Sequence, residues 1–71
     1  MNEWLRQAVA AIGGDLELSA DETRTLLDFA AHAAHESGHR TNAPLLCYLV
    51  GRLQGDRDLA TVVEEVRSAT S

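Results

Sequence analysis

One stretch of the chain, residues 26–51, constrains the fold more than any other. It contains all three histidines, the only proline, the only cysteine and the densest apolar patterning in the sequence. Gly38 is suited to the left-handed conformation that closes a helix, and Pro44 fits the first turn of a new helix. The stretch therefore predicts the second half of one amphipathic helix, a tight break and a second helix.

Start and stop signals elsewhere extend this pattern to a chain of four helices. Asn2 is a typical helix cap, and the Gly13–Gly14 pair ends the helix that Asn2 begins. Ser19 and Glu22 have the spacing of a capping box, in which side chain and backbone bond reciprocally. The sequence thus predicts an all-α fold, a compact four-helix bundle-like single domain spanning residues 1–71. Its helices are expected at residues 2–13, 20–37, 42–54 and 58–69.

The predicted third helix has the widest apolar arc, so it is expected to lie at the centre of the bundle. Thr41 or Asn42 is its expected cap, and Leu49 lies in the middle of its arc. The second helix has an apolar face of mostly small residues, with Phe29 at the edge of that face. The apolar residues predicted for the two faces are Leu26, Leu27, Ala30, Ala33 and Ala34, and then Leu45, Leu46, Leu49, Val50 and Leu53.

Composition excludes several classes of function. The formal net charge is −5 and the basic residues are scattered singly, whereas nucleic-acid binding requires clustered Lys and Arg. No apolar run approaches the roughly 20 residues that span a bilayer, and no basic-apolar leader is present. Cys47 is the single cysteine, which excludes an intramolecular disulfide and favours a reducing compartment. We expect a cytoplasmic chain with no nucleic-acid or membrane partner.

The histidine-rich segment fits the zinc-hydrolase signature H-E-x-x-H. In that signature both histidines bind zinc from adjacent turns of one helix, and the glutamate acts as general base. Here Gly38 is expected to end the helix before the second histidine, and no third ligand is evident. We favour a solvated polar face with no metal and no cofactor. The alternative left open is a small zinc-binding protein or zinc hydrolase, with candidate ligands His32, His35, Glu36 and His39.

A second candidate site is a shallow groove of small side chains on the third helix. Ala43, Cys47 and Gly51 recur every four residues, and Tyr48 and Phe29 flank the two central helices. Small residues let another backbone approach closely, and a tyrosine ring gives contact area at little entropic cost. Two interpretations stay open: another helix of the same domain fills the groove, or a second subunit or protein partner docks there.

Three short segments carry a resemblance to a known family. They are residues 2–5 (NEWL), residues 27–30 (LDFA) followed by Ala34 and His35, and residues 43–51 (APLLCYLVG). They resemble a small bacterial helical domain of unknown function that is found free-standing or fused to molybdenum-cofactor guanylyltransferases. The resemblance covers nearly the whole chain. It carries over Asp28, His35, Pro44 and Gly51 as characteristic positions.

The resemblance implies a function without chemistry of its own. Nucleotide transfer belongs to the fused domain, whose glycine-rich phosphate loop is absent from this sequence. We therefore expect a non-enzymatic accessory or protein-interaction domain linked to molybdenum-cofactor biosynthesis. Its expected partner is a protein, either a molybdenum-cofactor guanylyltransferase or a molybdoenzyme, and a homodimer is the other partnership left open.

Overall fold

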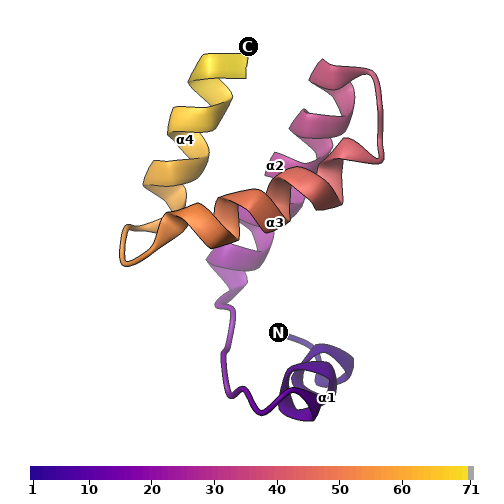
Figure 1. The fold of residues 1–71 in the computed structure, drawn as a ribbon, viewed down its shortest axis with the longest axis vertical. Coiled ribbons are helices and arrows are strands. Elements are labelled where there is room, and N and C mark those ends of the chain that lie inside the picture. The colour runs from indigo at the N-terminus through magenta and orange to yellow at the C-terminus, as the bar shows by residue number, and fades with distance from the viewer. Residues whose placement is uncertain (71) are drawn as a thin grey trace.

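The computed structural model describes residues 1–70, which form four α-helices (Figure 1). They are α1 (Glu3–Ala11), α2 (Ala20–Ser37), α3 (Asn42–Gln54) and α4 (Leu59–Thr70). Residues 1–70 contain no strand, so the predicted all-α, four-helix fold is confirmed. The bounds of α2 and α3 coincide with the predicted 20–37 and 42–54, whereas α1 is shorter than 2–13 and α4 is displaced by one residue from 58–69.

The start of α2 is fixed by the predicted capping box. The Glu22 amide donates to Ser19 Oγ at 3.0 Å, and the Ser19 amide donates to Glu22 Oε1 at 2.9 Å. These bonds satisfy two amides that have no partner inside the helix. The end of α2 also agrees with the sequence: Gly38 follows it with a φ of 72°, in the left-handed region that favours glycine.

The start of α3 differs from the prediction. Thr41 has helical backbone dihedrals and makes no capping hydrogen bond, and Asn42 already belongs to the helix, so the predicted side-chain cap is wrong. Backbone groups close the turn instead. The Asn42 amide donates to the His39 carbonyl at 3.0 Å, and the Ala43 amide donates to the Arg40 carbonyl at 3.1 Å. Because this turn supplies acceptors for the first amides, the helix begins without a capping side chain.

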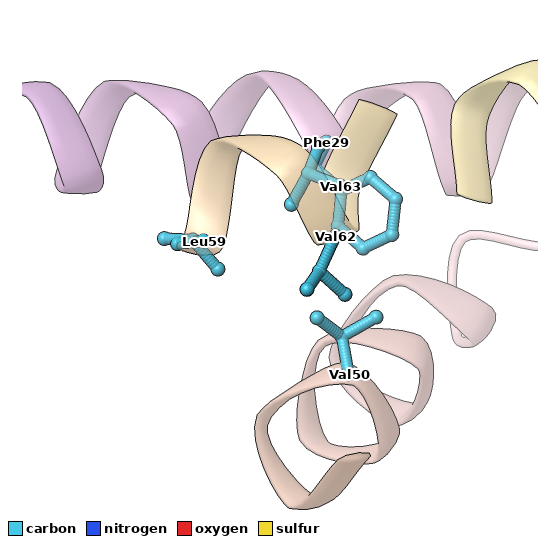
Figure 2. Close-up of a cluster of buried hydrophobic side chains, with 5 residues drawn as sticks. All are labelled: Phe29, Val50, Leu59, Val62 and Val63. Carbon is cyan, nitrogen blue, oxygen red and sulfur yellow. The ribbon is translucent and has the colours of Figure 1, made fainter. Parts of the chain in front are cut away.

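The core lies where α2, α3 and α4 meet (Figure 2). Phe29, at 0% exposure, is the largest fully buried side chain. The prediction that it lies at the edge of the α2 face is therefore wrong. Helix α2 packs against both α3 and α4, so its buried side is wider than the stripe of small residues and includes the ring. The buried side chains are Phe29, Ala33, Val50, Leu59, Val62 and Val63.

Only part of the predicted apolar arc of α3 is buried. Val50 is buried, and Leu46 and Cys47 pack against the core from half-buried positions. Leu49 keeps 49% of its surface exposed, so its predicted place at the centre of the core is wrong. Leu27, which was predicted to lie on the apolar face of α2, is also exposed. The physical reason is that three helices form the core, and no helix among residues 1–70 covers the outer side of α3.

Helix α1 lies apart from the other three helices, at one end of the long axis (Figure 1). Within residues 1–70 it does not approach another helix closely, and it has no buried residue. It is fastened instead to the connector that follows it, where Arg6 Nε binds the Glu17 carboxylate oxygens at 3.0 and 3.2 Å. The radius of gyration is 12.7 Å, compared with about 11 Å expected for a compact domain of this length. A projecting α1 is consistent with that difference.

Candidate interaction surface

The outer side of α3 carries a continuous row of exposed apolar side chains, here called the α3 stripe: Leu45, Tyr48, Leu49 and Leu53. Their exposed fractions are 60%, 64%, 49% and 73%. Spacings of three and four residues place them along one side of the helix, beside the buried Val50. At 1.5 Å per residue the row is about 12 Å long. It is the part of the predicted core arc that the fold leaves in solvent.

The charge around the α3 stripe differs from that of the whole chain. The sequence of α3, NAPLLCYLVGRLQ, has no acidic residue, although the chain carries a net charge of −5. The one charged residue of α3 is Arg52, whose guanidinium carbon lies 5.8 Å from the centroid of the Tyr48 ring. At this distance the cation is attracted to the face of the ring. The stripe is therefore apolar, with the single positive charge of its helix beside it at Arg52.

A cleft of about 430 Å³ adjoins the stripe at the start of α3. Leu45 belongs both to the stripe and to the wall of the cleft, which runs between the ends of α2 and α4. At its rim His32 Nε2 lies 2.9 Å from Thr70 Oγ1. The side chains around the cleft are His32, Ala33, Glu36, Ser37, Asn42, Leu45, Leu46 and Thr70. The cleft thus extends the apolar surface toward a polar edge.

The predicted groove of small residues is divided by the fold. Ala43 and Cys47 are half-buried, and Cys47 packs against the core cluster. Gly51 is exposed, and a Cβ built on it would meet no atom within 4 Å. Tyr48 is exposed, whereas Phe29 is buried and does not border a surface groove. The sequence pattern assigned the leucines of the stripe to the core, so it did not identify them as a surface. The apolar arc of α3 is wider than the part of the helix that packs against α2 and α4.

The environment of Cys47 affects its chemistry. Burial raises the pKa of its thiol above the ordinary value of 9.0, because a thiolate loses hydration there. A thiol of this kind is a weak nucleophile at neutral pH. This agrees with the structural role that its contact with the core indicates.

The histidine residues do not form the geometry of a zinc hydrolase. His35 lies in the last turn of α2, but Gly38 ends the helix, so His39 lies outside it. The two side chains are therefore not on adjacent turns of one helix. Across residues 1–70 no three His, Cys, Asp or Glu side chains are grouped closely enough to hold a metal ion. His35 and Asp28 instead border a shallow groove between α2 and α4.

These features define a small all-α domain that displays an apolar helix surface. The family model described as "Domain of unknown function (DUF6457)" matches residues 1–71, so the chain belongs to the DUF6457 family. This confirms the expected likeness to a small domain of unknown function, while the fusion to guanylyltransferases stays a prediction. No curated protein and no solved structure matches the chain. No helix within residues 1–70 has the length and apolarity to cross a membrane.

Proposed function

We propose that the chain is a non-enzymatic protein-interaction domain that docks through the α3 stripe. The observation that carries this proposal is the row of four large apolar side chains, exposed by 49% to 73%, along one helix. A chain of 71 residues has few large apolar side chains with which to build a core. A contiguous apolar patch on such a domain is typical of a surface that another protein covers.

The composition of the stripe also supports protein binding. Tyrosine and arginine are enriched among the residues that dominate binding energy at interfaces. The Arg52 guanidinium carbon lies 5.8 Å from the centroid of the Tyr48 ring, and the exposed Leu49 and Leu53 follow these two residues directly along the helix. The adjoining cleft can accept an apolar side chain of a partner, since Leu45, Leu46 and Ala33 contribute to its wall.

The burial of polar side chains bears on whether the domain is an enzyme. Catalytic acids, bases and nucleophiles are commonly desolvated, since burial adjusts their pKa values to the reaction. Within residues 1–70, however, no polar or charged side chain is buried. Glu36 is the one carboxylate among the described residues that line the cleft beside the stripe. Such a site is better suited to holding an apolar side chain than to activating a reacting group.

The class of partner follows from the sequence resemblance described above. We propose an accessory role in molybdenum-cofactor biosynthesis, in which the partner is a guanylyltransferase or a molybdoenzyme. The positive charge of Arg52 beside the stripe favours a partner surface that is apolar with an acidic margin.

Calorimetric titration of the purified chain against both enzymes of the same organism tests this proposal. Leu53→Gln removes a stripe side chain without adding charge, and we expect it to weaken binding by about tenfold or more. Leu27→Gln is the matched control, since Leu27 is 66% exposed on α2, outside the stripe. If neither enzyme binds the chain, the proposed role in molybdenum-cofactor biosynthesis is wrong. If Leu53→Gln and Leu27→Gln weaken binding equally, the α3 stripe is not the docking surface.

A further inference from the structure

Helix α1 presents a second unpartnered apolar surface, here called the α1 face: Trp4, Ala8 and Ile12. A spacing of four residues places Trp4 and Ala8 on one side of the helix, and Ile12 follows at its C-cap. Trp4 is 71% exposed and Ile12 is 87% exposed. The chain therefore displays two apolar helix surfaces, and neither is covered within residues 1–70.

The α1 face is held away from the α3 stripe of its own chain. The Met1 amino nitrogen donates to the Leu18 carbonyl at 3.2 Å, and the Gly14 amide donates to the Val9 carbonyl at 3.0 Å. Gly14 packs so closely that a Cβ built on it would lie 2.9 Å from Val9 Cγ1. The α2 capping box begins at Ser19, directly after this connector. Helix α1 and the connector that follows it are thus held to each other by these contacts, and together they project from the core.

The two surfaces match in length, and the ends that would meet carry residues of opposite charge. The α1 face runs from Trp4 to Ile12 and the α3 stripe from Leu45 to Leu53, so each is about 12 Å long at 1.5 Å per residue. Helix α3 carries only the positive charge of Arg52, whereas α1 has Glu3 in its first turn, with its carboxylate 3.7 Å from Arg6 of the same helix. Antiparallel docking would bring Glu3 toward Arg52 and would also align the helix dipoles favourably.

We propose that the α3 stripe is covered by the α1 face of a second copy of this chain, in a reciprocal homodimer. A two-fold axis uses each contact twice, so both apolar surfaces of both copies are buried together. The dimer therefore buries twice the area of a single α1–α3 contact. Stable interfaces bury roughly 1,200 Å² or more in total, so a short helix contact needs this doubling. The inference rests on the proposed role of the α3 stripe as a docking surface, and it names the α1 face of a second copy as the occupant when no partner enzyme is bound.

The single tryptophan makes this pairing directly measurable. Trp4 is the only tryptophan, and the chain has a mass of 7.7 kDa. On raising the concentration we expect light scattering to approach twice 7.7 kDa while Trp4 emission shifts to shorter wavelength. Trp4→Gln and Leu53→Gln should each weaken association by about tenfold or more, and Leu27→Gln should not. A monomer at every concentration would overturn the inference.

Disulfide trapping distinguishes the α1–α3 contact from other dimers. In a Cys47→Ala background, a chain with Ala8→Cys is mixed with a chain carrying Leu49→Cys in a glutathione redox buffer. We expect a covalent dimer in the mixture and little from either chain alone. Strong cross-linking of either chain alone would show α1–α1 or α3–α3 pairing and overturn the inference. A chain that carries both Ala8→Cys and Leu49→Cys tests the remaining case. If its disulfide forms within a monomer, the chain's own α1 covers the stripe and the inference is overturned.

The two proposals fail separately. If the chain is monomeric yet Leu53→Gln abolishes binding of a guanylyltransferase or molybdoenzyme, the homodimer is wrong and the proposed function stands. If the trapped α1–α3 dimer forms but neither enzyme binds, the homodimer stands and the molybdenum link is removed.

Discussion

His32 on α2 and Thr70 at the end of α4, which are 38 residues apart in the sequence, are joined by a side-chain hydrogen bond with 2.9 Å between Nε2 and Oγ1. The Thr70 hydroxyl also donates to the Val66 carbonyl at 2.8 Å. A hydroxyl has one proton, so in the bond to His32 it acts as acceptor and Nε2 carries the hydrogen. The last turn of α4 is thereby tied to the middle of α2.

Removing this bond should loosen the last turn of α4. We expect His32→Ala to lower the free energy of unfolding by about 0.5–1 kcal/mol, as for other partly solvated hydrogen bonds. Amide hydrogen exchange in the last turn of α4 should become faster. In a double-mutant cycle, Thr70→Ala should add little once His32 is replaced. Fully additive effects would mean that the two side chains are not coupled.

The core predicts a large difference between two apolar substitutions. Phe29→Ala should lower the free energy of unfolding by about 3–5 kcal/mol, because the ring is fully buried. Leu49→Ala should lower it by only about 1 kcal/mol in the monomer, since about half of that side chain is already in water. Guanidinium unfolding at low protein concentration measures both. Equal losses of unfolding free energy in the two variants would show that Leu49 belongs to the core, as the apolar pattern of the sequence predicted.

The capping box predicts a moderate loss on substitution. Ser19→Ala should lower the free energy of unfolding by about 1 kcal/mol without changing the fold, because the Glu22 amide loses its acceptor. Ser68→Ala is the matched control, since Ser68 lies in the last turn of α4, makes only a long hydrogen bond of 3.4 Å to Glu64, and gives way to alanine, the better helix former. Thermal melts of the two variants should therefore move in different directions. A Ser19 variant that melts like the unchanged chain would contradict this account of the start of α2.

The raised pKa of the Cys47 thiol predicts a fall in stability in alkaline solution. The folded chain holds the thiol proton more tightly than the unfolded chain, so stability is unaffected below the ordinary value of 9.0. It should decline as the pH rises above 9.0 toward the higher folded value. The sequence contains no lysine, so few other groups titrate in this range. Cys47→Ala should flatten the decline, and an unchanged slope in that variant would assign it to another group.

The arrangement of the histidines predicts that the protein needs no zinc. Because Gly38 ends α2 before His39, we expect tag-free protein to contain no stoichiometric zinc and EDTA to leave its melting curve unchanged. Elemental analysis and thermal melts provide the two measurements. One equivalent of tightly bound zinc that is lost in His35→Ala would show that a metal site exists.

Local signals in the sequence predicted most of the helix bounds. Ser19 with Glu22 determined where α2 begins, and Gly38 determined where it ends, because capping and left-handed backbone involve neighbours a few residues away. The same signals separated His39 from the helix that carries His35. The uncapped start of α3 was missed, since the backbone turn from His39 to Ala43 leaves no mark in residue type.

The amino-acid sequence by itself determined that this chain is a set of four amphipathic helices with short breaks. It could not show which apolar residues meet, because periodicity describes one helix while burial depends on how many helices pack around it. The tertiary structure placed Phe29 between α3 and α4, where two helices cover one side of α2. It also left α1 outside the core, so Leu49 and Leu53 face solvent. The candidate interaction surface therefore arises from the packing of the helices.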